Sequence, residues 1–117
     1  KSLRTYADVR DAVRAYYILV TKNPVAGEYY NIGGRYTCEV GDTLEALINM
    51  SPMKDQIKVE EDPERPRPID ADLQVPDCRK FTAHTGWEPV IPFEQTMEDL
   101  LNYWRNRVKG GHEFLTR

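Results

Sequence analysis

Two arginine-containing segments carry the residue types that bind anionic ligands. Arg4 stands just before a predicted helix, where the helix dipole and unpaired backbone amides favour a negative charge. Arg67 opens the run Arg67-Pro68-Ile69-Asp70-Ala71-Asp72, in which a planar guanidinium suits a phosphate and Asp70 could accept from sugar hydroxyls. Judged on the residues alone, ordinary surface charge on a proline-rich loop explains the second segment more simply.

Other site chemistries find little support in the sequence. Gly33 and Gly34 follow a predicted strand, but they lack the spacing of a dinucleotide loop or a P-loop, so a tight turn is favoured. His84 and His112 lie 28 residues apart and no Cys-x-x-Cys is present, so no metal site is predicted. The acidic run at 60–62 is typical of a solvated face. We therefore name no catalytic residue and no metal ligand in this chain.

Composition indicates one small globular domain. The chain has 117 residues, of which 40% are hydrophobic and 30% charged, with a net charge of -3. An acidic chain is a poor general binder of nucleic acid, and no apolar run has the length of a membrane span. The absence of a signal peptide and the wide spacing of Cys38 and Cys78 favour reduced thiols in the cytoplasm. Because the chain begins Lys1-Ser2 without a methionine, we interpret it as part of a longer protein.

Four helices are predicted from apolar periodicity and capping residues. Asp8, with Asp11 in a capping-box position, precedes a helix from Val9 to Thr21. Thr37 is expected to cap a second helix, whose apolar stripe runs from Val40 to about Met50. The other two helices are expected from Cys78 to Thr85, between Asp77 and Gly86, and from Pro92 to about Val108, with the aromatic residues Tyr16, Tyr17, Phe93 and Trp104 in the core.

Two short β-prone segments complete the pattern. These are residues 28–32 and the alternating segment 57–60. The three prolines between 63 and 68 then forbid a helix and keep that segment extended. The expected fold class is α/β, in an α+β-like form with about four helices and two or three short strands. So few strands would be marginal alone, which again indicates a missing partner region.

Four segments, spread in order along almost the whole chain, match a known pattern. They are Arg4-Thr5-Tyr6-Ala7-Asp8-Val9-Arg10-Asp11 with Ala15-Tyr16, Gly27-Glu28-Tyr29-Tyr30-Asn31-Ile32-Gly33, Arg67-Pro68-Ile69-Asp70-Ala71-Asp72, and Asp77 to Lys80 with Gly86-Trp87-Glu88-Pro89. The chain thereby resembles the C-terminal, substrate-binding part of extended short-chain dehydrogenase/reductases that act on nucleotide sugars. This is the NAD-dependent epimerase/dehydratase family.

The resemblance implies roles for the arginines singled out above. In such enzymes the arginines at the positions of Arg4 and Arg67 contact the nucleotide diphosphate, and the acid at the position of Asp70 contacts the ribose. It further implies that residues 1–111 form a C-terminal nucleotide-sugar-binding domain of a Rossmann-type enzyme, followed by a tail at 112–117. Such remote binding orients a hexose for chemistry elsewhere.

Departures from the family pattern limit what this chain can do alone. The Gly-rich cofactor loop and the Tyr-x-x-x-Lys pair, in which the tyrosine acts as acid/base, are both absent from the sequence. NAD(P) is therefore expected in the full-length enzyme, bound by a missing N-terminal Rossmann domain, and not by this chain, which should be inactive. Thr5 stands where the family usually has aspartate.

The resemblance implies a substrate class and leaves several activities open. It points to the branch of GDP-mannose 4,6-dehydratases, which convert GDP-mannose to GDP-4-keto-6-deoxymannose by hydride transfer through the cofactor and loss of water. A GDP-4-keto-6-deoxymannose reductase or another nucleotide-sugar epimerase/dehydratase is the alternative. The expected partners are a GDP-sugar, the N-terminal domain and further copies in a homo-oligomer. A different class, a non-catalytic helical interaction module, predicts a compact chain with ordinary charged surfaces.

Overall fold

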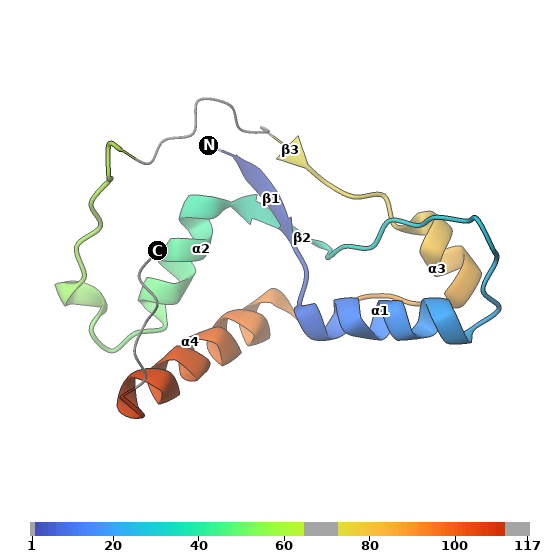
Figure 1. Ribbon diagram of the computed structural model, residues 1–117. Coiled ribbons are helices and arrows are strands. Elements are labelled where there is room, and N and C mark those ends of the chain that lie inside the picture. Colours follow the sequence, from blue (N-terminus) through green and yellow to red (C-terminus); the bar gives the residue numbers. More distant parts are fainter. Residues whose placement is uncertain (1, 65–72, 112–117) are drawn as a thin grey trace.

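The computed structural model describes residues 2–64 and 73–111. Within these residues the chain forms four α-helices, one short 3₁₀ helix and a three-stranded sheet, which confirms the expected α/β class (Figure 1). The elements, in chain order, are β1 (Leu3–Tyr6), α1 (Val9–Thr21), β2 (Tyr36–Glu39), α2 (Val40–Asn49), the 3₁₀ helix η1 (Lys54–Gln56), β3 (Leu73–Gln74), α3 (Arg79–Thr85) and α4 (Phe93–Lys109).

The sheet has the order β2-β1-β3. β1 pairs antiparallel with β2, so that Tyr6 faces Tyr36, and parallel with β3. The Thr5 hydroxyl donates to the Gln74 carbonyl oxygen at 2.8 Å and lies 2.8 Å from the Thr37 hydroxyl. Since Thr5 uses its one proton on Gln74, Thr37 donates to Thr5. The residue that replaces the usual aspartate thus ties all three strands together.

The helices begin and end close to their predicted limits. α1 has the predicted bounds, and the Asp8 side chain accepts from the Arg10 backbone N–H at 2.8 Å. The predicted capping box with Asp11 is wrong, because the Asp11 carboxylate binds a different segment. α3 ends at Gly86, whose φ of 72° is the left-handed geometry that glycine adopts without strain.

Two further caps differ from expectation. Thr37 lies in β2 and does not cap α2; instead the Asp42 carboxylate accepts from the Glu39 backbone N–H at 3.0 Å. Pro92 precedes the first helical residue of α4 where it was expected to occupy that position, and its carbonyl accepts from the Thr96 N–H at 3.2 Å. Neither difference moves a helix by more than a residue or two.

Both predicted strands are wrong. Residues 28–32 and 57–60 have no regular secondary structure, whereas 3–6 and 36–39 form the antiparallel pair. Alternating β-prone residues favour an extended backbone, but a strand also needs a neighbour to satisfy its backbone groups. Within the described ranges neither segment is paired with another strand.

The core joins α1 to α3 and the loop that follows it. Ala15, Phe81 and Trp87 are at most 2% exposed, and Ile18, Leu19, Tyr30 and Ile32 pack against them. The Trp87 Nε1–H donates to the Asp11 carbonyl oxygen at 3.1 Å, so the buried indole has a polar partner. Both cysteines are free thiols, as predicted.

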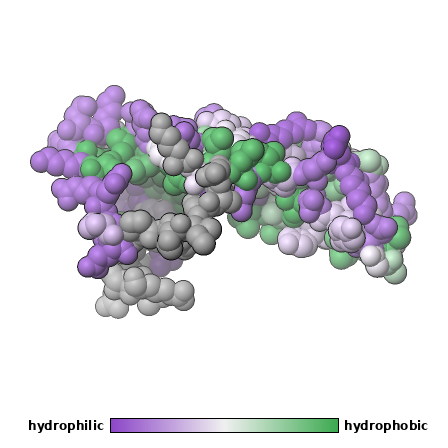
Figure 2. All heavy atoms as spheres, turned by 90° about the horizontal axis from the view of Figure 1, so that it is seen from above, coloured by the Kyte–Doolittle hydropathy of each residue, from purple (hydrophilic) through white to green (hydrophobic). Residues whose placement is uncertain are grey.

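The outward side of α1 is apolar and exposed, so the prediction that its stripe is core is wrong for this chain. Trp104 of α4 is also exposed, while Phe93 is half-buried. Figure 2 shows apolar residues reaching the surface in patches set among hydrophilic ones. Five residues of α1, here called the α1 stripe, are each between 61% and 72% exposed: Val9, Val13, Tyr16, Tyr17 and Val20.

Candidate functional site

Arg4 lies in the middle of the sheet. Because side chains alternate along a strand, Arg4 and Tyr6 share one face of β1, and their partners Cys38 and Tyr36 share that face with them. Arg4 is half-buried, and its Nη1 donates to the Leu3 carbonyl oxygen at 3.2 Å. The strand therefore holds this guanidinium on a defined face of the sheet.

The anion-binding argument based on the α1 N-terminus is corrected by the structure. The Asp8 carboxylate caps that terminus and is almost fully buried. A protein carboxylate thus already meets the positive end of the α1 dipole. Any ligand contact of Arg4 must come from its position on the sheet.

Arg67 and Asp70 lie outside the described residues. The sequence that contains them leads directly into β3, which the structure does describe. β3 pairs with β1 in parallel, with Leu73 beside Leu3 and Gln74 beside Arg4. The strand that follows the proline-rich motif is thus placed next to the strand that carries Arg4.

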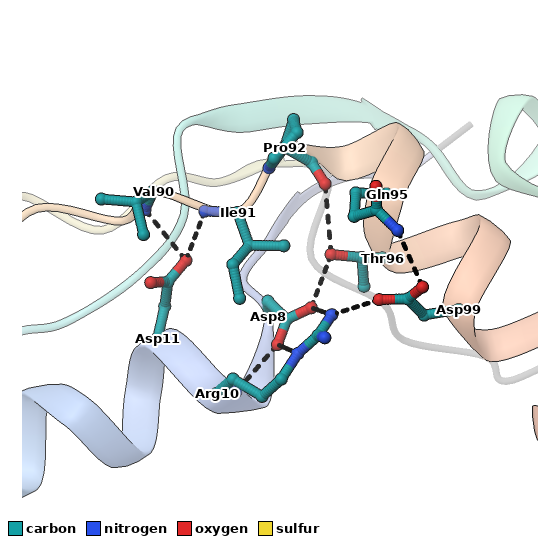
Figure 3. Close-up of polar contacts among 9 residues, drawn as sticks. All are labelled: Asp8, Arg10, Asp11, Val90, Ile91, Pro92, Gln95, Thr96 and Asp99. Atoms are coloured by element: carbon teal, nitrogen blue, oxygen red, sulfur yellow. Dashed lines mark hydrogen bonds and ion pairs between the residues drawn. The ribbon is translucent and has the colours of Figure 1, made fainter.

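A polar cluster fastens the start of α1 to the start of α4 (Figure 3). The Arg10 guanidinium donates to Asp8 at 2.8 and 2.9 Å and to Asp99 of α4 at 2.7 Å. The Thr96 hydroxyl donates at 2.7 Å to Asp8 Oδ2, the oxygen that also accepts from Arg10 Nη2. These donors, Arg10 first, hold the pKa of Asp8 well below its ordinary value. The end of β1 is thereby fixed relative to α4.

Asp11 fixes a second segment to α1. Its carboxylate is 1% exposed as a residue and accepts from the backbone N–H groups of Val90 and Ile91 at 3.0 and 2.9 Å (Figure 3). Arg14 donates to its other oxygen at 3.0 Å. Sequence reasoning missed this role because an acid three residues after Asp8 has the same spacing as a capping box.

A pocket of about 250 Å³ opens where β1 ends, beside the start of β2 and of α4. Tyr36 stacks on Phe93 with ring centres 4.3 Å apart, and Tyr6 meets Phe93 edge-on at 5.4 Å. The Arg35 guanidinium also lines the pocket and pairs with Glu88 at 2.5 Å. Desolvation by burial raises the pKa of the Tyr36 hydroxyl above its ordinary value. The remaining lining comes from Ala7, Asp8, Gly34, Thr96 and residues 89–92.

Close packing accounts for the two glycines beside this pocket. A Cβ on Gly33 would lie 2.3 Å from the Pro76 Cγ, and one on Gly34 would lie 1.5 Å from the Tyr6 carbonyl oxygen. Both distances are far too short for any larger residue. Neither glycine has a positive φ, so the reason differs from the expected tight turn.

The described residues offer no alternative site of a different kind. They contain no group of three or more histidine, cysteine or acidic side chains placed to hold a metal ion. None of the described helices combines the length and hydropathy needed to cross a bilayer. His84 lies between the Tyr30 hydroxyl, 2.5 Å from its Nδ1, and the Asn23 carbonyl oxygen, 2.9 Å from its Nε2.

Known proteins resemble this chain along most of its length. Residues 1–100 match the family described as GDP-mannose 4,6 dehydratase. The chain is 34% identical to a dTDP-glucose 4,6-dehydratase of Haemophilus influenzae over 114 residues, which cover 89% of this chain and 33% of that protein. It is 26% identical to a GDP-6-deoxy-D-mannose reductase of Pseudomonas aeruginosa over 106 residues, which cover 91% of this chain and 34% of that protein.

A solved structure shares the fold. RMD from Pseudomonas aeruginosa, complexed with NADPH, superposes with a TM-score of 0.75 at 24% identity. The match covers 91% of this chain and 34% of that one. The chain therefore spans about a third of the length of the relatives it matches.

Proposed function

This chain belongs to the GDP-mannose 4,6 dehydratase family of sugar-nucleotide dehydratases and reductases, and on that premise we propose that it is the C-terminal, nucleotide-sugar-binding part of a GDP-mannose 4,6-dehydratase. Its task in the whole enzyme is to hold the nucleotide diphosphate, so that the hexose is presented to groups carried elsewhere. Binding energy gained far from the reacting atoms then serves to orient them.

The pairing of β1 with β3 is the observation that carries this proposal. It places Gln74 beside Arg4, and the motif with Arg67 and Asp70 leads straight into β3. Two guanidiniums from segments more than 60 residues apart in sequence would grip a diphosphate from two sides. Asp70 would accept from the ribose hydroxyls. Arg4 contributes from the rigid middle of the sheet.

The cofactor of the family is NAD(P), and the residues of this chain do not fit it. The sequence holds no Gly-rich dinucleotide loop and no Tyr-x-x-x-Lys pair. We therefore assign this chain no step of hydride or proton transfer. Its residues bind and orient the substrate.

A preceding Rossmann domain is the proposed covalent partner, and the α1 stripe is its proposed contact surface. Monomeric soluble proteins rarely leave a contiguous apolar stripe exposed. Segment 28–32, in which Tyr30 and Ile32 pack against the core beside α1, belongs to no strand of the described sheet. The alternative of a non-catalytic helical module predicts ordinary charged surfaces. The exposed apolar side chains of the α1 stripe do not fit that prediction.

Calorimetric titration with GDP, GDP-mannose, UDP-glucose and free mannose tests the proposal. We expect the full-length protein to bind GDP and GDP-mannose and to ignore free mannose, since the diphosphate supplies the main contacts. Arg67→Ala should raise KM strongly, with little change in kcat, because it removes a contact that binds the substrate and the transition state equally well. Absence of any nucleotide binding, or an unchanged KM, would contradict the assignment.

The reductase is a second candidate, because one relative is named a GDP-6-deoxy-D-mannose reductase. Product analysis separates the two. A dehydratase converts GDP-mannose to a 4-keto sugar with no net change in cofactor redox state. A reductase leaves GDP-mannose untouched and consumes reduced cofactor only when the keto sugar is supplied.

A further inference from the structure

β3 is too short and too exposed to be held on the sheet by packing. It consists of Leu73 and Gln74, which pair with Leu3 and Arg4 of β1 (Figure 1). Both residues of β3 are exposed, Leu73 to 59%, so the strand buries little apolar surface. The ladder ends at Gln74, and Pro76 has no N–H with which to extend it. Because register is weakly specified in a strand with no buried face, β3 needs a further contact to stay in place.

The Thr5 hydroxyl provides this contact. It donates to the Gln74 carbonyl oxygen at 2.8 Å, just where the ladder between β1 and β3 ends. The Thr37 hydroxyl of β2, also 2.8 Å away, donates to Thr5 from the other side. A slip of β3 by one residue would carry the Gln74 carbonyl about 3.3 Å along the strand and break the bond. One side chain of the central strand thus fixes the register of its parallel neighbour.

Thr5 lies on the side of the sheet opposite to the proposed ligand contact. Side chains alternate along a strand, so Thr5 points to one face of β1, whereas Arg4 and Tyr6 point to the other. The backbone of β1 therefore separates the Thr5 hydroxyl from a ligand that rests on Arg4. Any influence of Thr5 on binding must pass through the placement of β3.

The placement of β3 matters for binding because of the residues that precede it. The register sets Gln74 beside Arg4, and Arg67 stands seven residues before Gln74 in the sequence. A segment whose end is already fixed beside Arg4 loses less conformational freedom on binding a ligand than one that must first be brought there. The bond between Thr5 and Gln74 would therefore lower the entropic cost of bringing two guanidiniums to one diphosphate.

We propose that Thr5 is a positioning residue, whose hydrogen bond to the Gln74 carbonyl keeps β3 beside Arg4 and so sets the affinity for the diphosphate of the substrate without touching it. The inference rests on the proposed function and deepens it. It also gives a consequence to the departure from the family pattern at position 5. An ionised aspartate there has no proton to donate to the Gln74 carbonyl, so threonine and aspartate are not equivalent in this sheet.

The experiment is calorimetric titration of the full-length protein with inorganic pyrophosphate and GDP, together with steady-state kinetics on GDP-mannose. Thr5→Val keeps the shape of the side chain but loses the donor. It should weaken both ligands by about five- to tenfold and raise KM by the same factor, with kcat unchanged. Thr5→Ser keeps the donor and should restore wild-type affinity. Thr5→Asp should resemble Thr5→Val.

Three matched measurements separate positioning from a general loss of stability. Thr37→Val removes the donor to Thr5 but leaves the bond to Gln74, so it should lower stability without lowering affinity. Arg67→Ala should cost less affinity in the Thr5→Val background than in wild type, because a displaced β3 has already weakened that contact. Arg4→Ala should cost the same in both backgrounds, since Arg4 stays on β1. Should Thr5→Val fail to fold, Thr5→Cys, with a weaker donor, allows the same comparison.

Several outcomes would overturn the inference. Wild-type affinity in Thr5→Val, or a Thr5→Ser variant as weak as Thr5→Val, would show that the hydroxyl does not position the site. A lower kcat with an unchanged KM would assign Thr5 to another step. Additive effects of Thr5→Val and Arg67→Ala would show that Thr5 does not act through β3. Binding that survives Thr5→Val but fails in Arg4→Ala would refute this inference alone, whereas a wild type that binds neither pyrophosphate nor GDP contradicts the proposed function as well.

Discussion

The junction of α1 with the 86–92 loop and the region where the end of β1 lies beside the start of β2 differ in how much of their side chains is exposed. In the first, Trp87 and Asp11 are at most 2% exposed, and the Asp11 carboxylate accepts hydrogen bonds from Arg14, Val90 and Ile91 of the same chain. In the second, Tyr36 is 42% exposed and the Arg35 side chain 66%, beside a pocket. Stability and binding are therefore assigned to different side chains.

Because of this separation, a substitution can lower stability at the junction without removing ligand contacts, and a substitution on the sheet can remove ligand contacts without lowering stability. A variant at the junction should lower stability and lose binding only through unfolding. A variant on the sheet face that carries Arg4 should lose binding while the fold persists. The four changes below test this contrast, beginning with the largest expected effect.

Asp11→Ala should be the most damaging. It leaves the backbone N–H groups of Val90 and Ile91 without their acceptor and Arg14 without its carboxylate. Removing one partner from a buried charged network costs about 3–5 kcal/mol. Urea unfolding followed by tryptophan fluorescence measures the loss, with Asp55→Ala, an exposed acid of η1, as the matched control. A loss below about 1 kcal/mol would show that the junction does not depend on Asp11.

Arg4→Ala should have the opposite effect from Asp11→Ala, because we expect it to lose ligand affinity while the fold is kept. We expect affinity for GDP and for pyrophosphate to fall by about ten- to hundredfold, as loss of a charged hydrogen bond of about 1.5–3 kcal/mol implies. Calorimetry measures the affinity, and circular dichroism checks that the variant remains folded. Arg105→Ala is the control for the loss of one positive charge. Unchanged pyrophosphate affinity would remove Arg4 from the diphosphate site.

Asp8→Asn should have a smaller effect that depends on pH. The pKa of Asp8 in the folded chain lies well below its ordinary 3.8, mainly because of Arg10, so its stabilising contribution is complete at pH 7, begins to fall as pH drops below 3.8, and is lost fully only below the folded pKa. The variant should lose about 1 kcal/mol at pH 7, as is typical for a weakened helix cap. Thermal melts at pH 7, 5, 4 and 3 should show a constant difference between the two proteins down to pH 5 and a difference that begins to narrow between pH 4 and 3.

The control for that experiment is Asp77→Asn. The pKa of Asp77 is lowered to about 2, mainly by hydrogen bonding to Arg79, but both side chains are exposed. Solvent screens such a pair, so its variant should follow the wild-type melting profile closely. A steeper change for Asp77 than for Asp8 would contradict the importance given to the α1–α4 cluster.

Val13→Ser should have the smallest effect on this chain. Val13 is 61% exposed, so its replacement should change the free energy of unfolding by less than about 0.5 kcal/mol. Ala15→Ser, on the buried side of the same helix, should cost more. In the full-length protein Val13→Ser should become clearly destabilising if the α1 stripe contacts a preceding domain. Equal tolerance in both contexts would argue against that contact.

The sequence predicted the helices well because their signals are local. Asp8, Gly86 and the apolar spacing of α1 and α4 lie within or next to the helices that they define. The strands were not predictable in this way, because a strand is decided by its partner. Residues 28–32 are as β-prone as 36–39, yet only the latter have β1 beside them.

The candidate site was predictable in part. Arg4 could be singled out from the sequence, but the reason given, the α1 N-terminus, failed because Asp8 already occupies it. The pocket beside Tyr36 was not foreseen, since its walls come from β1, β2 and α4 and no local pattern joins them. Arg67 and Asp70 stay predictions, because they lie outside the described residues.

The contact between Asp11 and Trp87 also bears on how the chain folds during its synthesis. The two residues are 76 positions apart, and the core needs both α1 and the segment around Trp87. At ribosomal rates of about 5–20 residues per second, α1 would wait roughly 4–15 seconds for its partner to be made. During that interval both sides of α1, and not the stripe alone, are available to chaperones.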